Sequence, residues 1–236
     1  MNQPLWKPDA ARIADTRVSA FMAQVNRDNA GLAITDYGQL HQWAVAHPEA
    51  FWDAVWRFSG VVASTRGETV LTDAHRFPGA RWFPEARLNF AQNLLRERSE
   101  QTALVSLLEN GERRSLSYAD LYRQVAQLAA SLRALGVTAG DRVVGFMPNI
   151  EQTVVAMLAA TSIGAIWSSC SPDFGINGVL DRFGQIQPKV LFCADGYYYN
   201  DKTCDSLERI RSVVAEIDSL EAVVLVPLVS AEPDLQ

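Results

Sequence analysis

The chain has 236 residues, a formal net charge of −6, 48% hydrophobic residues and 20% charged residues. This composition is ordinary for a folded globular protein and argues against a disordered or fibrous chain. The acidic excess argues against the broad basic surface that nucleic acid or an anionic membrane would require.

The cysteines and the first residues bear on cellular location. Cys170, Cys193 and Cys204 show no CxxC spacing and suit a reducing compartment. Residues 1–15 contain acidic residues and prolines where a signal peptide needs a basic start and an apolar run. No apolar stretch reaches the ~20 residues of a membrane span, so we expect a cytoplasmic protein without a membrane partner. The histidines form no HxH or HxxxH pair, and no metal site is expected.

The first part of the chain reads as helical. Apolar residues recur at helical spacing over 13–25, 37–43 and 51–56, and a loop over 77–87 leads into a short helix. The aromatic residues of these stretches are candidates for a ligand-facing surface, but spacings of three and four residues are more typical of core packing. The β-branched runs begin only after residue 100. We therefore predict an α-helical N-terminal extension over residues 1–95.

From residue 102 short apolar runs alternate with helical segments, which is typical of βαβ units. Ser117 and Asp120 resemble a capping box for a helix that ends before Gly136. The predicted strands are 103–108, 142–147, 165–169, 189–194 and 222–227, and further helices are expected over 151–163, 176–185 and 206–217. The later strands are almost continuously apolar, as strands buried on both faces are. The predicted fold class is α/β: a mostly parallel sheet flanked by helices over residues 96–236, after the helical extension.

Ligands of such sheets bind beyond the carboxyl ends of the strands, so three loops are informative. Pro148 and Asn149 read as a plain turn that is able to supply one amide to a ligand. In the loop 168–175, Ser171 and Asp173 either line a pocket or cap the following helix. Cys170 is a weak candidate nucleophile, because apolar burial raises the pKa of a thiol.

The third loop, residues 195–202, combines three consecutive tyrosines with Lys202. The tyrosines are able to stack on a purine and the lysine to meet a phosphate, or the loop is simply exposed, with its tyrosines packed on neighbouring helices. The motifs GxxxxGK(S/T), GxGxxG, GxSxG and HExxH do not occur, so the residues indicate no phosphate-binding loop and no catalytic group.

Three stretches resemble the acyl- and acetyl-CoA synthetase branch of the adenylate-forming enzymes. LSYADL at 116–121 is similar to an early L-(S/T)-Y-x-(E/D)-L motif, and residues 140–175 resemble the second conserved region of the family. The SSCSPDFG sequence at 168–175 resembles the acetoacetate-activating subgroup, where acetyl-CoA synthetases have a glycine-rich FGGF. Residues 82–95 resemble the same subgroup.

The resemblance implies part of an ATP-dependent acetoacetate-CoA ligase that needs ATP, Mg²⁺ and CoA. The phosphate loop, the nucleotide-binding aspartate region and the mobile-domain lysine of the family would all lie beyond residue 236. We therefore expect this segment to be inactive alone, to hold no catalytic residue and to bind none of these cofactors tightly. An apolar sheet edge that the missing part would cover is expected to favour self-association.

The resemblance also implies candidate CoA-binding residues. The loop that meets the CoA nucleotide in the family aligns with residues 171–174, Lys202 keeps a basic position, and Tyr199 replaces an arginine. The candidates are Ser171, Pro172, Asp173, Phe174, Tyr199 and Lys202. Two alternatives stay open: a naturally short, non-catalytic CoA-binding or interaction module, and a fragment of an acetyl- or propionyl-CoA synthetase, which SSCSPDFG disfavours.

Overall fold

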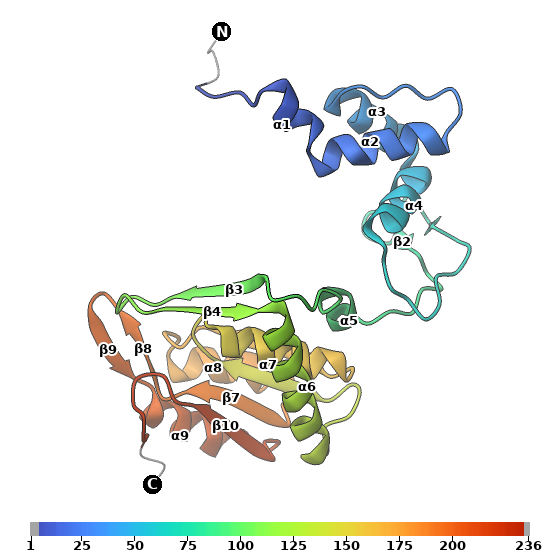
Figure 1. The fold of residues 1–236 in the computed structure, drawn as a ribbon. Coiled ribbons are helices and arrows are strands. Elements are labelled where there is room, and N and C mark those ends of the chain that lie inside the picture. The colour runs from blue at the N-terminus through green and yellow to red at the C-terminus, as the bar shows by residue number, and fades with distance from the viewer. Residues whose placement is uncertain (1–4, 234–236) are drawn as a thin grey trace. The chain divides into compact units, whose positions relative to one another are not determined.

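The computed structural model describes residues 5–233, so the first four residues of the predicted extension and the last three of the chain lie outside it. The chain divides into two compact units, Met1–Leu88 and Asn89–Gln236 (Figure 1). Each unit has its own apolar core. Within residues 5–233, none of the helices has the length and apolar character required to cross a membrane.

The first unit consists of helices followed by a short antiparallel hairpin, as far as the structure describes it. Its elements are α1 (Ala10–Ala14), α2 (Arg17–Asp28), α3 (Tyr37–Ala46), α4 (Pro48–Ser59), β1 (Leu71–Thr72) and β2 (Arg81–Trp82). The predicted stretch 13–25 is divided between two helices, because the Thr16 side chain accepts the Ser19 amide and starts α2 anew.

Aromatic rings form much of the core of this unit. The Phe21 ring lies 5.9 Å from the Phe51 ring and 5.2 Å from the Phe58 ring, both edge-on. Phe21 is buried, and Trp43 and Phe51 pack against the same cluster, which confirms core packing for these rings. Tyr37 and Trp52, by contrast, are 69% and 44% exposed, so core packing does not hold for them. The helices predicted over 37–43 and 51–56 are confirmed by α3 and α4.

The second unit is centred on a four-stranded parallel sheet with the order β10-β7-β5-β6. Its strands are β5 (Arg142–Phe146), β6 (Ile166–Cys170), β7 (Val190–Ala194) and β10 (Ala222–Val226). Val143 packs into one apolar cluster and its neighbour Val144 into another, so the sheet is buried on both faces. The predicted α/β class is confirmed.

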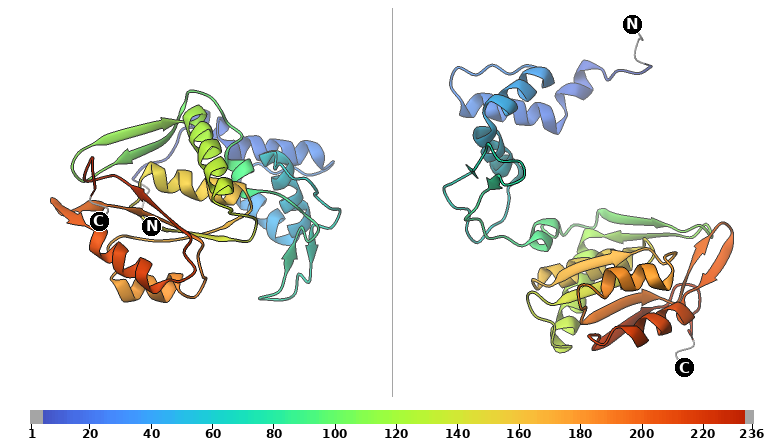
Figure 2. Two further views of the ribbon diagram at one scale, coloured as in Figure 1. Left: turned by 90° about the horizontal axis from the view of Figure 1, so that it is seen from below. Right: turned by 180° about the vertical axis from the view of Figure 1, so that it is seen from behind.

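Helices cover both faces of this sheet (Figure 2, left). One face carries α6 (Tyr118–Ala134) and α7 (Glu151–Ser162), and the other carries α8 (Ile176–Phe183) and α9 (Leu207–Glu216). The short helix α5 (Phe90–Leu94) also belongs to this unit, because Ala91 is fully buried in its core and the Asn89 side chain donates to the Thr161 carbonyl at 2.8 Å.

In the described part of the second unit, two antiparallel hairpins stand outside the parallel sheet. The run predicted at 103–108 forms β3 (Thr102–Leu107), which pairs with β4 (Arg113–Ser117) rather than with the sheet. The region predicted as a loop at 195–202 is largely a second hairpin, β8 (Gly196–Tyr199) with β9 (Lys202–Asp205). Asn200 and Asp201 form its turn with φ of 52° and 58°, a conformation that asparagine and aspartate tolerate better than most residues.

Candidate functional site

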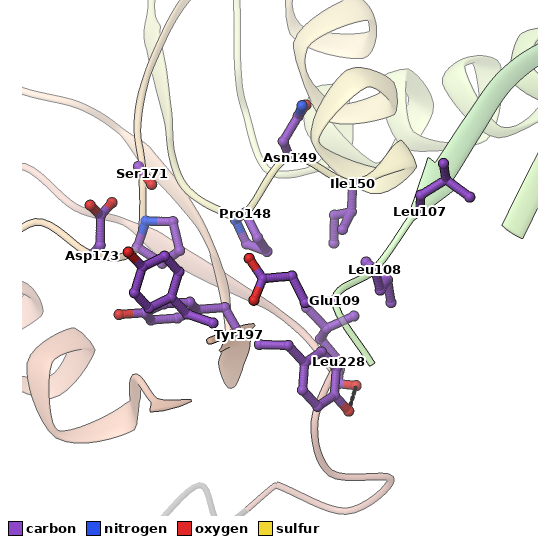
Figure 3. A pocket seen from close by; sticks show the side chains of 13 residues that line it. Leu107, Leu108, Glu109, Pro148, Asn149, Ile150, Ser171, Asp173, Tyr197 and Leu228 are labelled. Carbon is purple, nitrogen blue, oxygen red and sulfur yellow. Dashed lines mark hydrogen bonds between the residues drawn. The ribbon is translucent and has the colours of Figure 1, made fainter. Parts of the chain in front are cut away.

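The carboxyl ends of β5, β6 and β7 lie at the same end of the sheet, and the segments that follow them line a cavity of about 430 Å³ (Figure 3). The β3–β4 hairpin and the segment after β10 complete its wall. The lining residues are Leu107, Leu108, Glu109, Pro148, Asn149, Ile150, Ser171, Pro172, Asp173, Tyr197, Tyr198, Tyr199 and Leu228. The cavity therefore occupies the place where ligands of open α/β sheets bind.

The loop after β6 supplies Ser171, Pro172 and Asp173 to the cavity. The N-cap of α8 is Gly175, and within the described chain no side chain caps this helix. The capping interpretation of Ser171 and Asp173 is therefore wrong, and the pocket-lining interpretation holds for both. The amide of Phe174 donates to the Ser171 carbonyl at 3.2 Å, which fixes the turn that presents them.

The hairpin β8–β9 also supplies three tyrosines to the cavity lining. Tyr197 and Tyr198 are half-buried, whereas Tyr199 is 63% exposed. The Tyr198 hydroxyl donates to the Leu228 carbonyl at 3.5 Å, and the Arg209 guanidinium of α9 lies 5.8 Å from the centre of the Tyr197 ring. The three rings thus line a cavity, and the Tyr197 ring also lies beside α9, as expected for tyrosines that pack on a neighbouring helix. Stacking of these rings on a purine stays a prediction.

Glu109 is a cavity residue that the sequence analysis missed. It follows β3, and its carboxylate accepts the Asn200 amide at 2.6 Å, which joins the tips of the two hairpins. Of the 13 residues drawn around the cavity in Figure 3, Glu109 and Asp173 are acidic and none is basic. The cavity wall is thus negatively charged and unfavourable for a phosphate.

Two of the candidate residues lie outside this lining. Lys202 lines an adjoining cavity of about 200 Å³ together with Glu109, Tyr198 and Asp201. Phe174 packs against the apolar cluster on the α8 side of the sheet, with the Arg182 guanidinium 4.3 Å from the centre of its ring. The structure therefore brings Ser171, Pro172, Asp173 and Tyr199 together and sets Phe174 and Lys202 apart from them.

The thiol beside this loop is unsuited to nucleophilic attack. Cys170 is 7% exposed, and burial raises its pKa to about 11. Burial also raises the pKa of the fully buried Cys193 to about 12. Both thiols are protonated near neutral pH, and the thiolate is the nucleophilic form.

Comparison with known proteins identifies the family. The model of the AMP-binding enzyme family matches residues 90–236, and the acetyl-coenzyme A synthetase N-terminus model matches residues 37–94. The acetoacetyl-CoA synthetase of Xenopus tropicalis is 44% identical over 95% of this chain, and that of Rhizobium meliloti is 43% identical over 94%.

A solved acetoacetyl-CoA synthetase from Streptomyces lividans superposes with a TM-score of 0.91 at 45% identity and covers 99% of this chain. The chain spans 34% of the length of these two curated relatives and 36% of the solved protein. Because the first family model covers well over half of its residues, this chain belongs to the AMP-binding enzyme family.

Proposed function

We propose that the chain is the N-terminal part of an ATP-dependent acetoacetate-CoA ligase, which converts acetoacetate, ATP and CoA into acetoacetyl-CoA, AMP and pyrophosphate. The observation that carries the proposal is the likeness to acetoacetyl-CoA synthetases, in sequence and in fold, along nearly the whole chain. The loop 168–175 supports it further, since Ser171, Pro172 and Asp173 line the cavity at the sheet end.

The chemistry of the reaction supports a division of labour along the complete polypeptide. A carboxylate is a poor electrophile, so acetoacetate first attacks the α-phosphate of ATP, pyrophosphate leaves, and the CoA thiol then displaces AMP. The negative charge that develops on the phosphates in that first step must be stabilised by Mg²⁺, backbone amides or basic side chains. The acidic cavity wall offers no basic group among its lining residues. We therefore assign adenylation, ATP and Mg²⁺ to the part of the enzyme outside this segment, and no catalytic residue to the segment itself.

CoA is the ligand that the segment itself is proposed to contact. The tyrosine rings and Pro172 offer flat apolar surfaces to a purine, and Ser171 offers a hydroxyl. Lys202 in the adjoining cavity is the cation proposed to contact a phosphate of CoA. Glu109 and Asp201 line the same cavity, and their negative charges weaken its attraction for a phosphate. Phe174 is kept among the proposed CoA-binding residues because it anchors the loop by packing against the apolar cluster on the α8 side of the sheet. A single lysine in a cavity that two carboxylates also line predicts weak binding of CoA by the segment alone.

The test is acetoacetate-dependent release of AMP in the presence of ATP and CoA. It compares the 236-residue chain with a chain extended through the reading frame that follows it, and it includes acetate and propionate as alternative substrates. We expect turnover by the extended chain only, with acetoacetate preferred. Turnover by the 236-residue chain would contradict the proposed location of adenylation, and a preference for acetate or propionate would contradict the substrate.

The main alternative is a short, non-catalytic CoA-binding or interaction module. Binding of CoA to the 236-residue chain with a dissociation constant in the micromolar range or below, together with an inactive extended chain, would favour that module. The same assay thus separates the two functions.

Three further properties belong to this proposal. Residues 1–95 are proposed as an N-terminal extension whose last helix, α5, packs into the core of the second unit. Residues 96–236 are proposed as an incomplete subdomain of a larger adenylate-forming domain, and the location as cytoplasmic. The outer strands of the parallel sheet are β6 and β10, and Ile166 and Val223 on them are 53% and 42% exposed. We propose that these edges favour self-association of the isolated segment, which concentration-dependent sedimentation would reveal.

A further inference from the structure

Asp195 is a fully buried acidic residue next to the cavity, and the proposed reaction does not use it. It lies between the end of β7 and the start of β8, and it is 1% exposed. One carboxylate oxygen accepts the amides of Leu228 at 2.7 Å and Val229 at 3.1 Å, and the other accepts the amide of Ser230 at 2.8 Å. Three consecutive backbone donors thus converge on one carboxylate, and such charge-assisted hydrogen bonds are stronger than neutral ones.

The backbone of the same residue is also held at both ends. The Asp195 amide donates to the Val226 carbonyl of β10 at 3.3 Å, and its carbonyl accepts the Ser206 amide at the start of α9 at 2.9 Å. Asp195 therefore connects the segment after β10, the β8–β9 hairpin and the start of α9.

Gly196 allows the segment after β10 to approach closely. A Cβ atom at this position would lie 2.7 Å from a methyl group of Val229 and 2.5 Å from the Cys204 carbonyl oxygen, so no larger residue fits without displacement. The Tyr198 hydroxyl then reaches the Leu228 carbonyl. Residues 228–230 are thus packed directly onto the hairpin that carries the cavity tyrosines.

This arrangement fixes one wall of the cavity. The Leu228 side chain lines the cavity on the side away from Ser171 and Asp173 (Figure 3). Leu228 lies in a segment with no strand or helix of its own, so the carboxylate of Asp195 supplies the hydrogen bonds that a regular element would otherwise supply.

We propose that Asp195 is a positioning residue for the CoA-dependent half of the reaction: it holds Leu228 and the tyrosine hairpin at the separation that CoA requires. The inference rests on the proposed function and extends it to a residue outside the cavity lining. It assigns Asp195 no role in adenylation, because adenylation is placed outside this segment.

The experiment replaces Asp195 by asparagine in the extended chain. The asparagine oxygen still accepts the amides of Leu228 and Val229, but its NH₂ group faces the Ser230 amide, so two donors meet. We expect the KM for CoA to rise about tenfold. Acetoacetate-dependent exchange of pyrophosphate into ATP, which needs no CoA, should stay within about twofold of the unmodified enzyme.

Two variants complete the design. Asp205→Asn makes the same chemical change at an exposed residue at the base of the same hairpin, outside the cavity lining. The asparagine oxygen still accepts the Leu207 amide, so this variant should leave the KM for CoA unchanged. Leu228→Ala keeps the three amides and removes only the side chain from the wall, so it should raise the KM for CoA even if Asp195→Asn does not fold.

A third readout does not depend on activity. In the 236-residue chain, hydrogen exchange at the amides of residues 228–230 should be slow and should accelerate about tenfold in Asp195→Asn, while β7 amides keep their protection. Unprotected amides in the unmodified chain would overturn the inference.

The remaining outcomes separate the inference from the proposed function. An unchanged KM for CoA in both Asp195→Asn and Leu228→Ala overturns the inference, and so does an equal loss of both half-reactions in Asp195→Asn, which is the result of a general structural role. An inactive unmodified extended chain overturns the proposed function and this inference with it.

Discussion

The strand β7 and the hairpin that follows it are neighbours in sequence but differ in environment. All five residues of β7 are buried between the two helical layers, whereas in β8 burial declines until Tyr199 is 63% exposed. Packing of the buried strand contributes to the free energy of unfolding, whereas the hairpin presents its side chains to the cavity. Stability and binding in this unit are therefore separable by mutation.

Truncation of one aromatic residue in each region should give the largest contrast. Phe192 is 2% exposed, and its ring lies 6.1 Å from that of Trp167. Phe192→Ala should lower the free energy of unfolding by about 3–5 kcal/mol, because it leaves a cavity in the core. Tyr199→Ala should change it by less than about 0.5 kcal/mol. Urea unfolding followed by circular dichroism tests the pair, and similar losses would contradict the separation.

The pH dependence that each core thiol contributes should be a smaller effect than the truncation of Phe192. Burial raises the pKa of Cys170 to about 11 and that of Cys193 to about 12. Above about pH 9 the unfolded chain loses these protons while the folded chain keeps them, so stability is fully present below that pH and falls as the pH rises toward the folded pKa values.

We expect a loss of about 1.4 kcal/mol per pH unit for each thiol between about pH 9 and 11. Urea unfolding at several pH values measures it, and Cys170→Ala and Cys193→Ala each remove one contribution from the slope. An unaltered slope in both variants would show that other groups dominate the pH dependence.

The same contrast explains what the sequence made predictable. A continuous apolar run such as 189–194 indicates a strand buried on both faces, and β7 occupies 190–194. In β4, by contrast, the sequence RRSLS has a single buried residue, Leu116, and no apolar pattern by which to recognise it. The β8–β9 hairpin has consecutive tyrosines rather than alternating polar and apolar residues, so it resembles a loop.

The cavity residues also differ in how far the sequence predicts them. Ser171, Asp173 and Tyr199 were accessible to prediction because they follow strands whose carboxyl ends meet at one end of the sheet. Glu109 reaches the cavity from a hairpin outside the sheet, and Leu228 reaches it through the hydrogen bonds of its amide and carbonyl. These positions depend on tertiary contacts that no local pattern records.

A change in the hairpin turn should have a modest effect on stability. Asp201 has a φ of 58°, and Asp201→Gly would create an Asn-Gly pair, which favours this turn conformation. We expect the free energy of unfolding to rise by about 0.5–1 kcal/mol. Asp205→Gly introduces glycine within β9 of the same hairpin and should lower stability instead. If Asp201→Gly also lowers it, the Asp201 side chain stabilises the turn.

The smallest effect should come from Glu109, which joins the exposed hairpin to the cavity. Glu109→Gln keeps an oxygen to accept the Asn200 amide but removes the negative charge from the wall. On the proposed function, the KM of the extended chain for CoA should fall about twofold at low salt, and the difference should vanish near 0.5 M salt because exposed charges are screened. Glu112 lies with Glu109 in the turn between β3 and β4 but outside the cavity lining. Glu112→Gln is therefore the matched control and should leave the KM for CoA unchanged. A higher KM in Glu109→Gln would mean that the carboxylate accepts a hydrogen bond from CoA, and the acidic wall would then be part of the binding site rather than a barrier to phosphate.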